Sequence, residues 1–313
     1  MNTLKELYLI GNGFDMHHRI NSSYSQFKNW LENRDPVIFN RLFQVYELDG
    51  GDLWSRLEEN LGNVPIDAIL DNYVYSSFII FFERADGSNS FFNLDDFSDG
   101  PVPEIGLTLH RLYYFLEQYF TEWVLQLAEP DYNQRVLINK ANSYFINFNY
   151  TRTLETAYGI LQENIYYIHG CADLNQHLIF GHNQKPESIK SNWQFDSLED
   201  YEKDLLEEAI EDMMTLYKDV TSIIQNSHEI WEKLSDVKTI HIWGLSLSDV
   251  DLPYLKHIKG IVNADAKWEF SWYDIDDKLH KENIIKQLSL ENASLVQLSD
   301  IVITHHQQTN LFD

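Results

Sequence analysis

The sequence predicts an α/β fold in which a largely parallel sheet is covered by helices on both faces. Two observations predict it. Short runs rich in β-branched and aromatic residues alternate with long stretches that have helical spacing. Several of these runs are apolar on both faces, as in a parallel sheet buried under helices. The predicted strands are residues 7–10, 143–148, 165–168, 178–180, 239–243, 268–273 and 295–303.

Helix signals fall between these strands. Ser23 begins a capping-box pattern and predicts a helix start, and Asp35 before a proline predicts a second one. From Leu109 onward, apolar residues recur every three or four positions, which predicts one long helix with a wide buried face. Residues 195–235 are rich in acids among leucine and methionine and predict one or two helices with a solvated face.

Together these elements predict a single α/β domain over residues 1–313. Strands that alternate with helices and are apolar on both faces form doubly wound, Rossmann-like sheets. The core is expected from residues 1–25, 141–185 and 237–313, and long helical insertions from residues 26–140 and 186–236.

The net charge of −26 limits the expected partners. Binding to nucleic acid or to an anionic membrane depends on lysine and arginine side chains that neutralise phosphates, and acids outnumber these side chains here by 49 to 23. We therefore expect neither nucleic acid nor membrane as a partner. The phosphates of a small ligand would have to be held by backbone N–H groups.

The sequence also predicts a cytoplasmic location. No apolar run reaches the ~18 residues that cross a bilayer, and no signal-peptide pattern precedes the first predicted strand. The single cysteine, Cys171, excludes an internal disulfide and a zinc site built from paired cysteines.

The first predicted strand leads into a turn with two glycines and an aspartate, within LYLIGNGFDMHHRINSSYSQF. Such a turn exposes backbone N–H groups above the carboxyl end of the strand, where ligands bind in open α/β sheets. The residues predicted to hold a nucleotide there are Gly11, Asn12, Gly13, Phe14 and Asp15. Asp15 is expected to cap the following turn or to accept hydrogen bonds from ribose hydroxyls. A tight turn without a ligand is the alternative, because Met16 stands where a full Gly-x-Gly-x-x-Gly pattern has its third glycine.

Polar residues also end other predicted strands. Asn149 follows strand 143–148, and His169 follows strand 165–168. Because the carboxyl ends of parallel strands meet at one edge of a sheet, both side chains are expected in the crevice above that edge. Taken alone, His169 would be a hydrogen-bonded structural histidine, but its pairing with Asn149 and a glycine turn favours a site.

Two more turns at strand ends complete the candidate site. Gly244 and Ser246 follow strand 239–243, and Asp274 follows strand 268–273, where it could meet an adenosine ribose. A serine-hydrolase elbow is excluded because Ser248 occupies the place of its second glycine. Asp251 is expected to cap the next helix.

In this order the motifs resemble the AbiH family of bacteriophage abortive-infection proteins. The segments that carry the resemblance are LIGNGFDMHHRINSSYSQF, NFNYTRTLETAYG, IHG, FGHN and GLSLSDVDLPY. At a greater distance they resemble the sirtuin-like NAD-binding domain, whose asparagine and His-Gly pair correspond to Asn149 and His169. Phe148 and Thr151 depart from the polar residue and the aspartate that flank that asparagine.

The resemblance implies an antiphage defence protein that depletes NAD as a glycohydrolase once a phage trigger is present. Asn149 and His169 would be catalytic, NAD would be the substrate, and no metal would be required. The asparagine would orient the ribose or a water, and the histidine would accept a proton. The insertions could gate the site or form a homo-oligomer interface.

Two alternatives remain open. A non-catalytic module that senses NAD or ADP-ribose would fit the departures at Phe148 and Thr151. A metal-dependent nuclease would use His17, His18 and His182, but adjacent histidines point to opposite faces of an extended chain, and the acidic charge opposes nucleic-acid binding.

Overall fold

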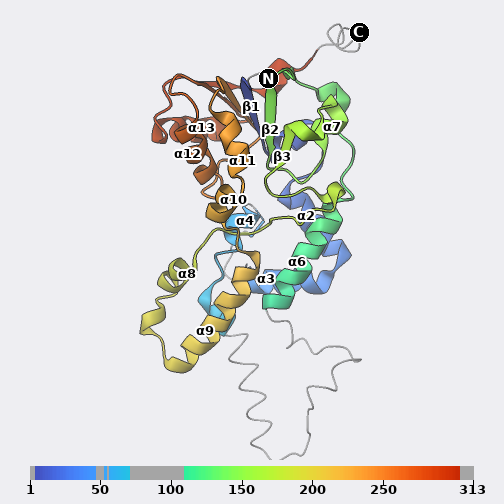
Figure 1. Cartoon of the computed structure of the whole chain (residues 1–313). Coiled ribbons are helices and arrows are strands. Elements are labelled where there is room, and N and C mark those ends of the chain that lie inside the picture. Colours follow the sequence, from blue (N-terminus) through green and yellow to red (C-terminus); the bar gives the residue numbers. More distant parts are fainter. Residues whose placement is uncertain (1–3, 47–52, 55, 71–108, 304–313) are drawn as a thin grey trace, which may run out of the picture. The chain divides into compact units, whose positions relative to one another are not determined.

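The computed structural model describes residues 4–46, 53, 54, 56–70 and 109–303 (Figure 1). The chain forms two compact units, and each is described by itself. The sheet unit comprises Met1–Phe27, Thr121–Ile179 and Asp219–Asp313, and the helical unit comprises Lys28–Phe120 and Phe180–Lys218.

The sheet unit contains a six-stranded sheet in the order β3-β2-β1-β4-β5-β6. Its strands are β1 (Glu6–Ile10), β2 (Ser143–Asn147), β3 (Ile165–Tyr167), β4 (Thr239–Trp243), β5 (Lys267–Ser271) and β6 (Ala293–Val296). All five strand pairs of this sheet are parallel, which confirms the predicted Rossmann-like α/β class. The strand order reverses between β1 and β4, so the switch point of the sheet lies there.

The described residues of the two units also form α-helices. They are α1 (Asn12–His17), α2 (Tyr24–Arg34), α3 (Pro36–Tyr46), α4 (Leu57–Asn60), α6 (Leu109–Val124), α7 (Thr153–Tyr158), α8 (Pro186–Asn192), α9 (Asp200–Met213), α10 (Val220–Asn226), α11 (His228–Trp231), α12 (Leu252–Ile261) and α13 (Ile275–Gln287). Single 3-10 turns lie at η3 (Tyr132–Gln134), η4 (Gln162–Asn164), η5 (Ala172–Leu174), η6 (Phe195–Ser197), η7 (Met214–Leu216), η8 (Glu232–Leu234) and η9 (Leu298–Ile301).

Both faces of the sheet are buried under helices. Successive side chains of a strand point to opposite faces, so Leu7 and Leu9 of β1 pack in one cluster, which includes residues of α10, α12 and α13. Tyr8 and Ile10 pack in a second cluster with residues of α1 and α7. Figure 1 shows α12 and α13 on one side of the strands and α7 on the other. Burial on both faces explains why these strands are apolar runs rather than alternating patterns.

The helical unit has its own buried core. The hydroxyl groups of Tyr46 and Tyr113 lie 2.6 Å apart, and Tyr46 also donates to the carbonyl oxygen of Leu61 at 3.0 Å. Lys218 is buried and pairs with Glu58 at 2.6 Å, which neutralises its charge in the interior.

Several local predictions agree with these elements. The side chain of Asp35 accepts hydrogen bonds from the backbone N–H groups of Val37 and Ile38, so it caps α3 as predicted. Helix α6 spans Leu109–Val124, which confirms the long helix, and α2 begins directly after Ser23. All six strands lie within the predicted core segments. That the chain is one domain with two insertions stays a prediction.

Other local predictions were wrong. Residues 178–180 form no strand, because Ile179 makes one backbone hydrogen bond, to the carbonyl oxygen of His169, and joins no ladder. The last strand ends at Val296 rather than at residue 303, and η9 follows it. The acidic region 195–235 forms three α-helices, α9, α10 and α11, with 3-10 turns between and beside them, and the Asp219 side chain caps the start of α10.

No helix in the described part of the chain is both long and apolar enough to cross a membrane.

Candidate functional site

The turns that follow β1 and β4 pack backbone against backbone at the switch point. The N–H of Gly11 donates to the carbonyl oxygen of Trp243 at 2.9 Å, and the N–H of Gly13 donates to that of Gly244 at 2.8 Å. Gly244 has a φ of 71°, and a Cβ there would lie 2.1 Å from the backbone nitrogen of Phe14. Only glycine therefore permits this approach, and the two glycine turns predicted from the sequence are in contact.

Some of the N–H groups predicted to hold phosphates are used within the protein. Gly13 donates to the turn after β4, and the N–H of Phe14 donates to the carbonyl oxygen of Gly11 at 2.9 Å. The side-chain amide of Asn12 donates to the carbonyl oxygen of Ser22 at 2.8 Å. The role of these residues toward a nucleotide stays a prediction.

Asp15 lies at the centre of a buried hydrogen-bond network. Its side chain is 1% exposed, and its two oxygens accept hydrogen bonds from the hydroxyl groups of Thr151, at 2.5 Å, and Thr153, at 2.7 Å. Burial raises the pKa of Asp15 to about 6, against the lowering effect of these two hydroxyl groups and of the nearby Asn149 amide. The loops after β1 and β2 are thus joined through one carboxylate.

Asn149 lies in this network and is 5% exposed. Its side-chain nitrogen donates to the carbonyl oxygen of Gly11 at 3.1 Å. Its backbone N–H donates to the side-chain oxygen of Asn147 at 3.0 Å, and the Asn147 amide donates to the carbonyl oxygen of Thr151 at 3.2 Å. Asn147 was not predicted as a site residue, although an asparagine at the end of an apolar strand was a signal for it. The Thr151 hydroxyl donates to Asp15.

His169 follows β3 and is 3% exposed. Its Nε2 lies 3.3 Å from the hydroxyl of Tyr254 on α12, and its ring meets that of Phe148 edge to face at 5.3 Å. Phe148 immediately precedes Asn149, and its N–H donates to the carbonyl oxygen of Ile10 at 2.8 Å. His169 is therefore next to the loop that carries Asn149.

The last two predicted site residues lie in other local contacts. Ser246 is exposed and donates to Asp251 at 3.2 Å. Asp251 is the N-cap residue of α12, as predicted, but its side chain makes no capping hydrogen bond. Asp274 is exposed and caps α13 by accepting from the N–H of Asp277 at 2.8 Å. The described hydrogen bonds do not connect Asp274 with the network around Asn149.

Lys281 on α13 is a residue that the sequence analysis missed. Its side chain is 1% exposed, and its Nζ donates to the carbonyl oxygens of Leu245, at 2.5 Å, and Ser246, at 2.9 Å. It also pairs with Asp277 at 3.0 Å. Burial lowers the pKa of Lys281. The only sequence signal for a paired lysine was its spacing of four residues from Asp277. This spacing is common on exposed helices, so it does not indicate burial.

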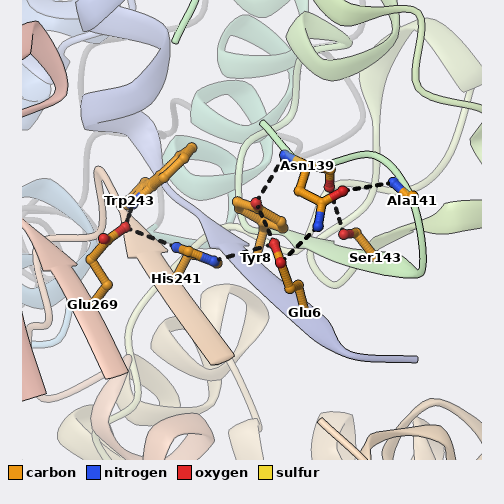
Figure 2. Close-up of polar contacts among 8 residues, drawn as sticks. All are labelled: Glu6, Tyr8, Asn139, Ala141, Ser143, His241, Trp243 and Glu269. Carbon is orange, nitrogen blue, oxygen red and sulfur yellow. Dashed lines mark hydrogen bonds and ion pairs between the residues drawn. The ribbon is translucent and has the colours of Figure 1, made fainter. Parts of the chain in front are cut away.

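A second polar cluster, shown in Figure 2, crosses the sheet on the face of Tyr8. Tyr8 of β1 pairs with His241 of β4, which pairs with Glu269 of β5, and the rings of Tyr8 and His241 stack at 4.3 Å. His241 Nδ1 lies 2.8 Å from Glu269, and its Nε2 lies 3.5 Å from Glu6. Tyr8 donates to Glu6 at 2.9 Å, and Asn139 does so at 2.7 Å.

The charged groups of this cluster shift the pKa values of its own members. The hydrogen bond from His241 lowers the pKa of Glu269. Burial and the neighbouring Glu6 raise the pKa of Tyr8, so its hydroxyl stays protonated and donates. The cluster draws on β1, on Asn139 before β2, and on β4 and β5, so no linear motif joins its residues and the sequence did not predict it.

The three histidines of the nuclease alternative are occupied by other contacts. His17 bonds the carbonyl oxygen of Gln134 at 2.8 Å, and His182 bonds that of Met213 at 3.0 Å. His18 lies between the carbonyl oxygen of Phe14 and the hydroxyl of Tyr158, and burial lowers its pKa to about 4. Across the described ranges, no three His, Cys, Asp or Glu side chains gather as a metal-binding group.

The six-stranded parallel sheet, with glycine turns in contact at its switch point, defines a Rossmann-like α/β protein. Residues 7–272 match the family model described as bacteriophage abortive infection AbiH. The chain belongs to this family and is an abortive-infection protein. No curated protein and no solved structure matches it.

Proposed function

We propose that this protein cleaves NAD to nicotinamide and ADP-ribose when a phage-derived trigger is present. The observation that supports the proposal is the meeting of the turns after β1, β2 and β4 at the switch point of a parallel sheet. Dinucleotides bind at this position in doubly wound folds. Loss of NAD would arrest the infected cell, which is the outcome that abortive infection requires.

The reaction needs little from the protein beyond positioning and one base. The bond between the ribose C1′ and nicotinamide breaks, and its electron pair goes to the cationic ring nitrogen, which becomes neutral without a proton. Water then attacks the oxocarbenium-like C1′, as in glycoside hydrolysis. In the proposal Asn149 orients the water or the ribose, and His169 takes the proton that the water loses. The products are nicotinamide and ADP-ribose.

The acidic charge of the chain limits how NAD can be attracted to the site. Long-range attraction does not bring NAD to the site, so affinity must come from short-range contacts with backbone N–H groups and side chains. The proposal assigns these contacts to Gly11, Asn12, Gly13 and Phe14, with Gly244, Ser246 and Asp274 toward the adenosine half.

Release of nicotinamide tests the proposal. Purified protein is incubated with NAD, with and without lysate of phage-infected cells, and products are separated by liquid chromatography. Asn149→Ala and His169→Ala are expected to abolish release. Asn226→Ala and His228→Ala change the same residue types at exposed positions near α11 and serve as controls. Intact NAD under all conditions, with no binding by calorimetry, would overturn the proposal.

The second candidate is a module that binds NAD or ADP-ribose without cleaving it. The observation that favours it is that the Asn149 amide and the Gly13 N–H are bonded inside the protein, while His169 is buried beside Phe148 and Tyr254. Two results would favour this candidate over the enzyme. Calorimetry would show that NAD binds, and the NAD would be recovered intact. Cells that carry His169→Ala would still arrest on infection.

The proposed setting is the cytoplasm, with NAD and the phage-derived trigger as partners. Self-association is a further expectation, and light scattering at cellular concentration tests it.

A further inference from the structure

The orientation of the Asn149 carboxamide follows from its neighbours. Its nitrogen lies 3.1 Å from the carbonyl oxygen of Gly11. A backbone carbonyl accepts hydrogen bonds and cannot donate them. The NH2 group must therefore face Gly11, because the flipped amide would place its oxygen against this acceptor. The same amide lowers the pKa of the Asp15 carboxylate, so these two groups are neighbours. The carboxamide oxygen is the atom left for a ligand.

The Asp15 carboxylate is itself held in place. Thr151 and Thr153 donate to different oxygens of Asp15, at 2.5 Å and 2.7 Å, so the carboxylate cannot rotate without losing a bond. Thr151 in turn accepts at its carbonyl oxygen from the Asn147 amide, and the Asn147 side-chain oxygen accepts from the backbone N–H of Asn149. In a buried site, such a hydrogen-bonded network favours one geometry because each broken bond would leave a costly unpaired group.

We propose that Asp15 is a positioning residue: it holds Thr151, whose carbonyl oxygen binds the Asn147 amide that fixes Asn149, and so it keeps the Asn149 carboxamide oxygen directed at the ligand. Asn149 then acts as a hydrogen-bond acceptor for an O–H group, either a ribose hydroxyl or the attacking water. This role deepens the proposed function and rests on it for the identity of the ligand. Asp15 itself does not touch the ligand.

The first test needs no activity. The side-chain amide signal of Asn149 is followed by 15N-correlated NMR from pH 4.5 to 8 in the wild-type chain. When Asp15 takes up a proton, the carboxylate loses an acceptor, so the Asn149 signal should shift with a midpoint at about 6. The groups described as acting on the pKa of Asp15, Thr151, Thr153 and Asn149, do not titrate in this range. An Asn149 signal that is insensitive to pH would overturn the proposal.

Variants separate positioning from simple stabilisation. In Asp15→Asn the NMR signal should no longer titrate, and kcat for NAD cleavage should fall about 10²-fold with KM changed less than about threefold, as expected when a reacting group is misplaced. The wild-type kcat should decline below pH 6, and this limb should be absent in the variant. The double change Thr151→Val with Thr153→Val should also lower kcat.

The outcomes separate the two proposals. Thr156→Val on the same helix removes a hydroxyl that bonds the backbone carbonyl oxygens of Arg152 and Thr153 but no side chain of the network, and serves as the control. If the Asn149 signal titrates but no NAD is cleaved, the proposed function fails and the orientation of Asn149 stands. If NAD is cleaved and Asp15→Asn leaves kcat and its pH profile unchanged, the positioning role is refuted and the proposed function survives.

Discussion

Replacing Asp15 by asparagine should change how stability depends on pH. The ordinary pKa of an aspartate is 3.8, and burial raises that of Asp15 to about 6. A raised pKa means that the folded state binds the proton more tightly than the unfolded state does. The resulting stability is fully present below the ordinary pKa and is lost as the pH rises through about 6. Asparagine has the same shape and does not titrate, so Asp15→Asn should lack this dependence.

The size of the effect follows from the two pKa values. Their separation, from 3.8 to about 6, corresponds to about 3 kcal/mol at ~1.4 kcal/mol per pH unit. About 2 kcal/mol of this change falls between pH 4 and pH 7, because the folded group remains protonated until the pH approaches 6. Relative to the variant, the wild type should therefore lose about 2 kcal/mol of unfolding free energy over that interval. Hydrogen bonds lost in the variant add an offset that is nearly independent of pH.

The assay must report on the sheet unit, because a chain with two compact units need not unfold in one step. Both proteins are equilibrated in urea at several pH values, pulse-labelled with deuterium at a fixed pH, and read by mass spectrometry on peptides from β1 and β2. The difference between their unfolding free energies cancels the titration of the other carboxylates. A difference in unfolding free energy that stays constant between pH 4 and 7 would refute the reasoning. A difference that changes with the opposite sign would show that the hydrogen bonds to Asp15 lower its pKa by more than burial raises it.

Three further predictions concern contacts around the site, and urea unfolding measures each. Gly244→Ala should destabilise the sheet unit by several kcal/mol, since the new Cβ would collide with backbone atoms. The control Gly260→Ala, which lies in open space on α12, should stabilise the sheet unit by up to ~1 kcal/mol. Equal effects of the two substitutions would contradict the close backbone approach at Gly244. Lys281→Met should cost about 3 kcal/mol, because one oxygen of the Asp277 carboxylate and two carbonyl oxygens lose the partner that Lys281 gives them, against little change for the exposed Lys286→Met. Glu269→Gln should cost on the order of 1 kcal/mol at pH 7. The hydrogen bond from His241 lowers the pKa of Glu269, so this stability is present above pH 4.5 and is lost as the pH falls through the lowered pKa. The cost should therefore shrink in acid, and a cost that persists there would exclude this hydrogen bond as its cause.

The sequence by itself determined the fold class and the family. Strand positions were predictable because burial on both faces of a parallel sheet requires continuous apolar runs, which are local features of the chain. The glycine turns at Gly11 and Gly244, and the polar strand end at Asn149, were predictable for a related reason: chain reversal and strand termination constrain residue type locally. The segment 178–180 shows the limit, since a short apolar run does not reveal whether a neighbouring strand is present to pair with it.

Only the tertiary structure decided how these residues are used. Asp15 reads as a nucleotide ligand next to a glycine turn, yet its carboxylate is bonded by Thr151 and Thr153, which lie 136 and 138 positions away. Lys281 reads as a solvated lysine on a charged helix, yet it is buried against the turn after β4. Such contacts join residues remote in sequence, and hydrophobic periodicity carries no information about them, because it reports which face of an element is buried and not which group lies opposite.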